Sequence, residues 1–207
     1  MSASIDFKRS CQTYRATTCF AQIEVPDRRY LMIDGHGDPN TSAAYAEAIA
    51  AVYPVAYAVK FASKRSLDRD YVVPPLEALW WAADMDSFTV HRDKTEWDWT
   101  LLSMVPDWIS VGLIDDSIAA VRAKGAAPQL DRLRHNILSE GRCVQVLHVG
   151  PYDDEAQTLR RLHDEYIPNH GLTMTGRHHE IYLSDARRTA PEKLRTILRQ
   201  PVMISRA

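Results

Sequence analysis

Two kinds of hydrophobic pattern alternate along this chain. The apolar run at residues 30–33 has the composition of a buried strand, and a polar turn follows at residues 34–40. After the turn, apolar side chains recur every three or four residues, which predicts a helix with one apolar face. These positions are Tyr45, Ile49, Val52 and Ala56. Pro54 lies among them and is expected to kink or interrupt the helix.

The middle of the chain predicts further strands and a second helix. Residues 71–81 are rich in β-branched and aromatic side chains and indicate one or two strands broken by Pro74 and Pro75. Residues 97–101 alternate with the period of a strand. An apolar stripe then predicts a helix that ends near Gly125, where glycine supplies the C-terminal cap. The stripe consists of Ile114, Ile118 and Val121.

The last third of the chain repeats the order of the first. An apolar run at residues 143–149 is followed by a turn at residues 150–154 and by a helical stripe of apolar residues. That stripe consists of Leu159, Leu162 and Tyr166. The segments 33–54 and 147–168 have equal length and both end in proline, which predicts a duplicated strand–helix–strand unit. Residues 189–198 combine capping-box spacing with helical spacing and predict a short closing helix.

A carboxylate inside each copy is the most informative feature of this repeat. Glu180 lies in an alternating run that is typical of a strand, and the register of the repeat matches it to Glu77. A carboxylate in the middle of a strand is costly to bury unless its charge is used. The alternative is a strand glutamate that faces solvent. The matching position of Glu77 favours a shared role, with both carboxylates pointing into one groove.

Aromatic side chains gather near these carboxylates. Four of the five tryptophans lie within twenty residues, namely Trp80, Trp81, Trp97 and Trp99. Strand alternation places Glu77 on the face of Trp81, and Glu180 on the face of Tyr182. Rings beside carboxylates suit a flat, apolar or cationic ligand, although core packing explains any single tryptophan equally well. A register error of one residue would exchange Trp80 for Trp81.

Strands that alternate with helices, together with hairpin-like strand pairs, predict an α+β fold. We expect an antiparallel sheet with helices on one face. Two copies related by a pseudo-twofold axis would leave a groove between them, and such junctions are frequent ligand sites. The expected organisation is one domain over residues 1–207, with a first module at about 28–104, a connecting helical segment at about 105–140 and a second module at about 141–207. The lead-in residues before the first module are expected to add a strand or a short helix at the edge.

Composition narrows the choice of partner. The chain has 207 residues, of which 45% are hydrophobic and 25% charged, and this balance is typical of a globular protein with a substantial core. The net charge of -2 and the scattered Lys and Arg residues argue against nucleic acid or an anionic membrane as partner. A small neutral or cationic ligand fits better. The chain shows no apolar leader and no run of ~20 apolar residues, so a cytoplasmic location is expected.

No cofactor, metal or disulfide is expected. The three cysteines have an odd count and no metal-site spacing. His178 and His179 are adjacent in a predicted strand and point to opposite faces, so they do not readily ligate one ion together. The turn at residues 35–37 lacks the third glycine of a dinucleotide fingerprint, and no P-loop or nucleophile elbow is present.

Several motifs together resemble the GyrI-like (gyrase-inhibitor-like) small-molecule-binding proteins, which are related to the effector-binding domains of multidrug-responsive regulators. The motifs are Ile33–Asn40, Pro75–Trp81, Gly150–Glu155 and His178–Asp185, continuing to Pro201. They cover nearly the whole chain. The resemblance implies two βαββ modules with a ligand groove between them. In that groove, bulky hydrophobic or cationic ligands meet a glutamate at the position of Glu180, and Tyr152 lines the wall.

The stand-alone form, with its tryptophan-rich middle, resembles the cyclopropanoid cyclopropyl hydrolase subfamily, whose aromatic cage hydrolyses cyclopropane-containing DNA-alkylating natural products. This resemblance implies that the protein acts on xenobiotics and that Glu180 is catalytic, activating water. The expected ligand-binding residues are Glu77, Trp81, Trp97, Trp99, Tyr152 and Tyr182. Two alternatives stay open: a non-catalytic drug-sequestering or effector-binding protein, and a gyrase-inhibitor-type module whose partner is DNA gyrase.

Overall fold

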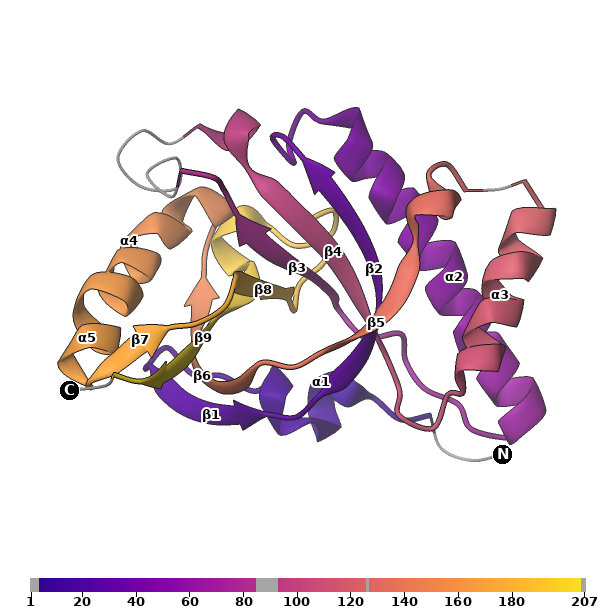
Figure 1. Cartoon of the computed structure of the whole chain (residues 1–207), viewed down its shortest axis with the longest axis horizontal. Helices are drawn as coiled ribbons and strands as arrows, with labels where there is room; N and C mark the ends of the chain where they lie inside the picture. Colours follow the sequence, from indigo (N-terminus) through magenta and orange to yellow (C-terminus); the bar gives the residue numbers. More distant parts are fainter. Residues whose placement is uncertain (1–3, 85–92, 126, 206–207) are drawn as a thin grey trace.

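The computed structural model describes residues 4–84, 93–125 and 127–205. Within these residues, nine strands form an antiparallel sheet in the order β1-β6-β9-β8-β3-β4-β2-β5, and β7 pairs with β9 (Figure 1). The strands are β1 (Ala21–Val25), β2 (Arg28–His36), β3 (Leu76–Trp81), β4 (Asp98–Val105), β5 (Arg134–Leu138), β6 (Gly141–Val149), β7 (Leu172–Met174), β8 (His178–Tyr182) and β9 (Arg195–Ile204). The helices are α1 (Phe7–Ser10), α2 (Ala43–Leu67), α3 (Val111–Ala123), α4 (Glu155–Arg160) and α5 (Ile167–Asn169), and a π-helical segment, Arg161–Tyr166, joins the last two.

The strand order consists of two related halves. The first half contributes β2, α2, β3 and β4, and the second contributes β6, the helix from α4 to α5, β8 and β9. From the centre of the sheet outward, β3-β4-β2 on one side corresponds to β8-β9-β6 on the other, and β5 and β1 close the two edges. The predicted α+β fold, with duplicated βαββ modules about a pseudo-twofold axis, is therefore confirmed.

The longer helices cover one face of the sheet. α2 packs on β2 and β4, and α3 packs on α2, so that one hydrophobic cluster joins these elements. α4 and α5 lie at the other end of the sheet, as Figure 1 shows. The opposite face holds a second cluster that includes Tyr14 from the segment around α1. The lead-in residues thus supply a short helix and, as β1, an edge strand. No helix in the described ranges is long and apolar enough to cross a membrane.

α2 is longer than the sequence pattern indicated. It runs from Ala43 to Leu67 and continues through Pro54, so the expected interruption is wrong. Ala51, Val52 and Val55 flank the proline and are fully buried in the cluster with the sheet. This packing offsets the loss of the backbone hydrogen bond that proline cannot donate.

The predicted closing helix is also wrong. Residues 195–204 form β9, which lies between β6 and β8 in the interior of the sheet. Every side chain from Thr196 to Val202 is buried. Because both faces of this strand are covered, its apolar residues do not alternate, and their spacing imitated that of a helix. The predicted connecting helical segment likewise contains a strand, β5, which pairs with β2.

The register at the centre of the sheet corrects the match between the two strand glutamates. Glu77 pairs with Ile181, whereas Ala78 pairs with Glu180. Directly paired residues point to the same face of a sheet, and neighbours along a strand point to opposite faces. Glu77 and Glu180 therefore lie on opposite faces, because the predicted register was one residue out.

Candidate functional site

A cavity of about 860 Å³ opens between the two modules on the helical face of the sheet. β3 and β8 form its floor, α2 forms one wall, and α4 with the turn before it forms the other. The floor contributes Leu76, Trp80, His178, Glu180 and Tyr182, α2 contributes Tyr45, Ile49, Tyr53 and Tyr57, and the second wall contributes Tyr152, Glu155, Ala156 and Leu159. Both modules are needed to enclose this space.

Glu180 lies on the floor of the cavity, where 13% of its side chain is exposed. The Tyr182 hydroxyl donates a hydrogen bond of 2.8 Å to Oε2 of Glu180, and Nε1 of Trp80 donates to the same hydroxyl at 3.2 Å. These donors fix the carboxylate among the rings. Burial, followed by the charge of Glu180, raises the pKa of Tyr182 well above its ordinary value. Tyr182 therefore keeps its proton and remains a hydrogen-bond donor at neutral pH.

A second cavity carboxylate, Glu155, was not predicted. It begins α4 and is 5% exposed. Burial, followed by the charges of Glu155 and Glu180, raises the pKa of Tyr152 to about 12, so both carboxylates act on this ring. A signal for Glu155 exists in the sequence, because it stands one helical turn before Leu159 on the buried stripe of that helix.

Aromatic rings line both sides of the floor. The ring centroids of Trp80 and Trp97 are 5.6 Å apart in an edge-to-face arrangement, and those of Tyr45 and Trp80 are 6.1 Å apart and stacked. Across the floor, the rings of Tyr152 and Tyr182 meet edge to face at 5.6 Å. Such packing holds the rings in fixed orientations, so they offer preformed surfaces for a flat ligand.

Four of the residues expected at the site line the cavity together. They are Glu180, Trp97, Tyr152 and Tyr182. Trp80 lines the cavity in the place expected for Trp81. The predicted register of β3 was one residue out, so the side chains on its two faces are exchanged. Trp81 instead lies under the guanidinium of Arg177, whose Cζ is 3.4 Å from its ring centroid.

Trp99 packs beneath the cavity wall and does not line the cavity. Its side chain is fully buried, and Nε1 donates a hydrogen bond of 3.2 Å to the carbonyl oxygen of Gly37. The ring covers Gly35 so closely that a Cβ atom there would lie 2.0 Å from it. Gly35, the first glycine of the turn, therefore has a packing role, because the absence of a side chain makes room for this tryptophan.

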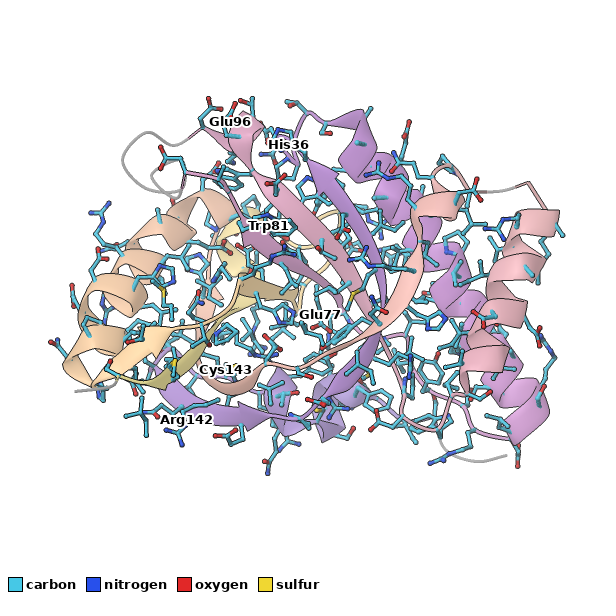
Figure 2. All side chains as sticks on the ribbon, in the orientation of Figure 1. His36, Glu77, Trp81, Glu96, Arg142 and Cys143 are labelled. Atoms are coloured by element: carbon cyan, nitrogen blue, oxygen red, sulfur yellow. The ribbon has the colours of Figure 1, made fainter. Side chains whose placement is uncertain are left out.

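Glu77 belongs to a separate cluster on the other face of the sheet. Nε2 of His179 lies 2.9 Å from Glu77, and Nδ1 of the same ring lies 2.9 Å from Glu140. Arg199 contacts Glu140 at 3.1 Å, and all four side chains are at most 3% exposed. We call Glu77, Glu140, His179 and Arg199 the buried ion network. Figure 2 shows Glu77 near the middle of the molecule and Trp81 farther along the same strand.

Within the described ranges, no group of three or more His, Cys, Asp or Glu side chains is arranged to hold a metal ion. The residues that line the cavity offer carboxylate charge, hydroxyl donors, aromatic surface and the imidazole of His178.

Comparison with known proteins agrees with this geometry. Residues 20–203 match the model of the GyrI-like small molecule binding domain. Among solved structures, an uncharacterized conserved protein from Listeria innocua is 37% identical, with a TM-score of 0.87, and the alignment covers 97% of this chain and 100% of that one. Two structures described as hydrolases from Listeria innocua are 35% and 34% identical, with TM-scores of 0.82 and 0.83 and the same coverage. No curated protein matches the chain.

The family match extends over most of the chain and includes both modules and the cavity between them. The three Listeria structures exceed 30% identity over 97% of the chain. The protein therefore belongs to the GyrI-like small molecule binding domain family.

Proposed function

We propose that this protein binds bulky aromatic xenobiotics in the cavity between its modules and hydrolyses those that carry a strained cyclopropane ring. The observation that carries the proposal is the position of Glu180, which is fixed by Tyr182 on the floor of an aromatic cavity. A carboxylate in that position can accept a proton from water beside a ligand that the rings hold flat.

The cavity has the size and lining that such ligands require. Its volume of about 860 Å³ lies within the range that drug-sized ligands occupy. Trp80 and Trp97 supply aromatic faces on one side, and Tyr152 supplies one on the other. A planar ligand would stack on these rings, and a cationic one would also be attracted to their π-faces and to Glu180.

The reaction we propose is the addition of water to the strained ring. Glu180 takes a proton from water, and the water oxygen bonds to a ring carbon. One carbon–carbon bond of the ring breaks, and its electron pair moves into the electron-withdrawing group conjugated to the ring, where a proton is added. Positioning of the two reactants and general base catalysis are the contributions that this site can make. Two relatives described as hydrolases support a hydrolytic reaction.

The test is to incubate the purified protein with a cyclopropane-bearing alkylator and to measure the ring-opened product by mass spectrometry. Glu180→Gln should lower the rate about 100-fold, since general base catalysis contributes roughly 10²–10⁴-fold. Glu24→Gln is a matched control, because Glu24 is also a strand glutamate but lies exposed on β1. Binding without any product in the wild type would remove the hydrolytic proposal and leave a drug-sequestering protein.

A further inference from the structure

His178 is a buried base beside Glu180 that the proposed reaction does not use. The two residues lie on the same face of β8, and both line the cavity. His178 is 8% exposed, and within the described chain neither of its ring nitrogens has a hydrogen-bond partner. Its Nε2 lies 3.6 Å from Oε1 of Glu180, which is within ion-pair range but longer than a hydrogen bond.

The adjacent His179 shows how an imidazole between two carboxylates is held in this protein. Each of its nitrogens lies 2.9 Å from a carboxylate oxygen, and its side chain is not exposed. Burial lowers the pKa of His179, but Glu140 and Glu77 outweigh burial and raise it to about 9. That proton is held between two fixed anions. His178 lies at a longer distance, 3.6 Å, from Glu180, and that carboxylate faces the cavity.

The other groups around His178 do not compete with Glu180 for its proton. His163, in the π-helical segment, lies with its ring centroid 6.1 Å away. Burial, followed by the nearby His178, lowers the pKa of His163 to about 4, so it is neutral near pH 6. Trp80, which pairs with His178 from β3, carries no charge, and neither does Gln200 of β9.

We propose that His178 is the exchangeable proton partner of Glu180. In the empty cavity, the imidazolium balances the charge of Glu180. When a cationic ligand lies beside that carboxylate, two cations compete for one partly buried anion, and His178 releases its proton to solvent. Glu155, another carboxylate that lines the cavity, belongs to the opposite wall.

This inference rests on the proposed function and adds one step to it. For a cationic substrate, whose binding has already left His178 neutral, the proton that Glu180 takes from water passes to Nε2 of His178 and then to solvent, so that the carboxylate is restored without an oxidant or reductant. The distance of 3.6 Å must shorten to roughly 2.6–3.2 Å for this transfer, and contacts between catalytic partners often tighten only when the substrate binds. His178 acts through Glu180 and is therefore a positioning residue.

Proton release on binding tests the pairing without requiring turnover. Ethidium, a planar cation, is titrated into the protein at pH 6 by calorimetry in two buffers that differ in ionisation enthalpy. The proposal requires the imidazolium of His178 to be present before the dye is added, and a mildly acidic buffer favours it. The wild type should release protons as the dye binds, and His178→Gln should lose that release. His163→Gln is the matched control and should retain it, because His163 is already neutral.

Nile red, a neutral planar dye, checks that His178→Gln still folds and encloses the cavity, and its binding should release no protons from any variant. The inference is overturned if His178→Gln releases as many protons as the wild type, or if the wild type fails to bind ethidium or binds it without release. A wild type that releases protons but opens no strained ring would remove only the hydrolytic proposal.

Discussion

Glu180 and Glu77 lie on neighbouring strands, one residue pair apart, and their surroundings differ completely. Glu77 is fully buried beside His179, and the hydroxyls of Tyr14 and Tyr30 donate to its two oxygens. Glu180 retains 13% exposure, receives the hydroxyl of Tyr182 and borders an open cavity. The first carboxylate is enclosed by fixed partners, whereas the second has capacity left for a ligand.

This difference shows that the two faces of one sheet serve different purposes: one contains a buried ion network that stabilises the fold, and the other borders the cavity. Strand alternation alone sends successive side chains to opposite faces, so adjacent positions can serve unrelated purposes. On the face of Glu77, cations and anions neutralise one another, and removing one of them leaves an uncompensated charge. On the face of Glu180, the neutral Tyr182 hydroxyl holds the carboxylate, and the proposed cationic partner, His178, lies farther away and is exchangeable.

The largest effect should come from breaking the buried ion network. Glu77→Ala should lower the free energy of unfolding by about 3–5 kcal/mol, because buried partners of an ion pair cannot recover their lost contacts in water. Glu180→Ala should change it by only about 1 kcal/mol. Urea unfolding followed by circular dichroism measures both values. Equal losses in the two variants would contradict the distinction between the two faces.

The buried ion network should also limit stability at both ends of the pH range. Burial lowers the pKa of His179, but Glu140 and Glu77 outweigh burial and raise it from 6.5 to about 9. The contribution of His179 is therefore complete below pH 6.5 and is lost as the pH rises through 9. Burial opposes ionisation of Glu140, but His179 and Arg199 lower its pKa from 4.5 to about 2. Its contribution is complete above pH 4.5 and is lost as the pH falls through 2.

Each of these two shifts corresponds to about 3 kcal/mol. Unfolding midpoints in urea between pH 2 and 10 should therefore be highest between about pH 4.5 and 6.5. A midpoint that rises steadily from pH 6.5 to 9 would show that His179 does not carry the proton assigned to it.

A smaller effect should separate the adjacent tryptophans of β3. Trp80→Ala should weaken binding of a planar aromatic dye about tenfold, since an aromatic pair contributes roughly 0.5–1.5 kcal/mol beyond its buried area. Trp81→Ala is the matched control on the opposite face and should leave the affinity unchanged. Fluorescence titration of both variants measures the two affinities. Weaker binding in Trp81→Ala alone would show that Trp81, and not Trp80, faces the cavity, as the register predicted from the sequence requires.

The smallest effect should come from the hydroxyls that contact the two glutamates. Tyr182→Phe should lower ring opening about fivefold, because it removes a hydrogen bond to Glu180 worth about 1 kcal/mol. Tyr14→Phe should lower stability and leave the rate unchanged, since Tyr14 donates to Glu77. Reaction rates and urea unfolding midpoints are measured for both variants. A slower reaction in Tyr14→Phe would show that the face of Glu77 also influences catalysis at Glu180.

Much of the fold could be predicted because the local patterns agreed with it. The apolar stripe of α3 ends before Gly125, whose φ of 64° is left-handed, as expected for a glycine at a helix end. The run at residues 143–149 lies within β6. β9 escaped prediction because a strand covered on both faces loses its alternation. Glu180, Tyr152 and Tyr182 were expected at one site and do line one cavity.

The sequence by itself determined that the chain contains two related units, that aromatic residues gather near strand carboxylates, and that composition suits a small ligand. These properties depend on residue type and spacing along the chain. Only the tertiary structure decided that Glu180 and Trp80 face the cavity while Glu77 and Trp81 face away from it. A shift of one residue between β3 and β8 reverses every side chain, and that register depends on packing between segments about one hundred residues apart in the chain.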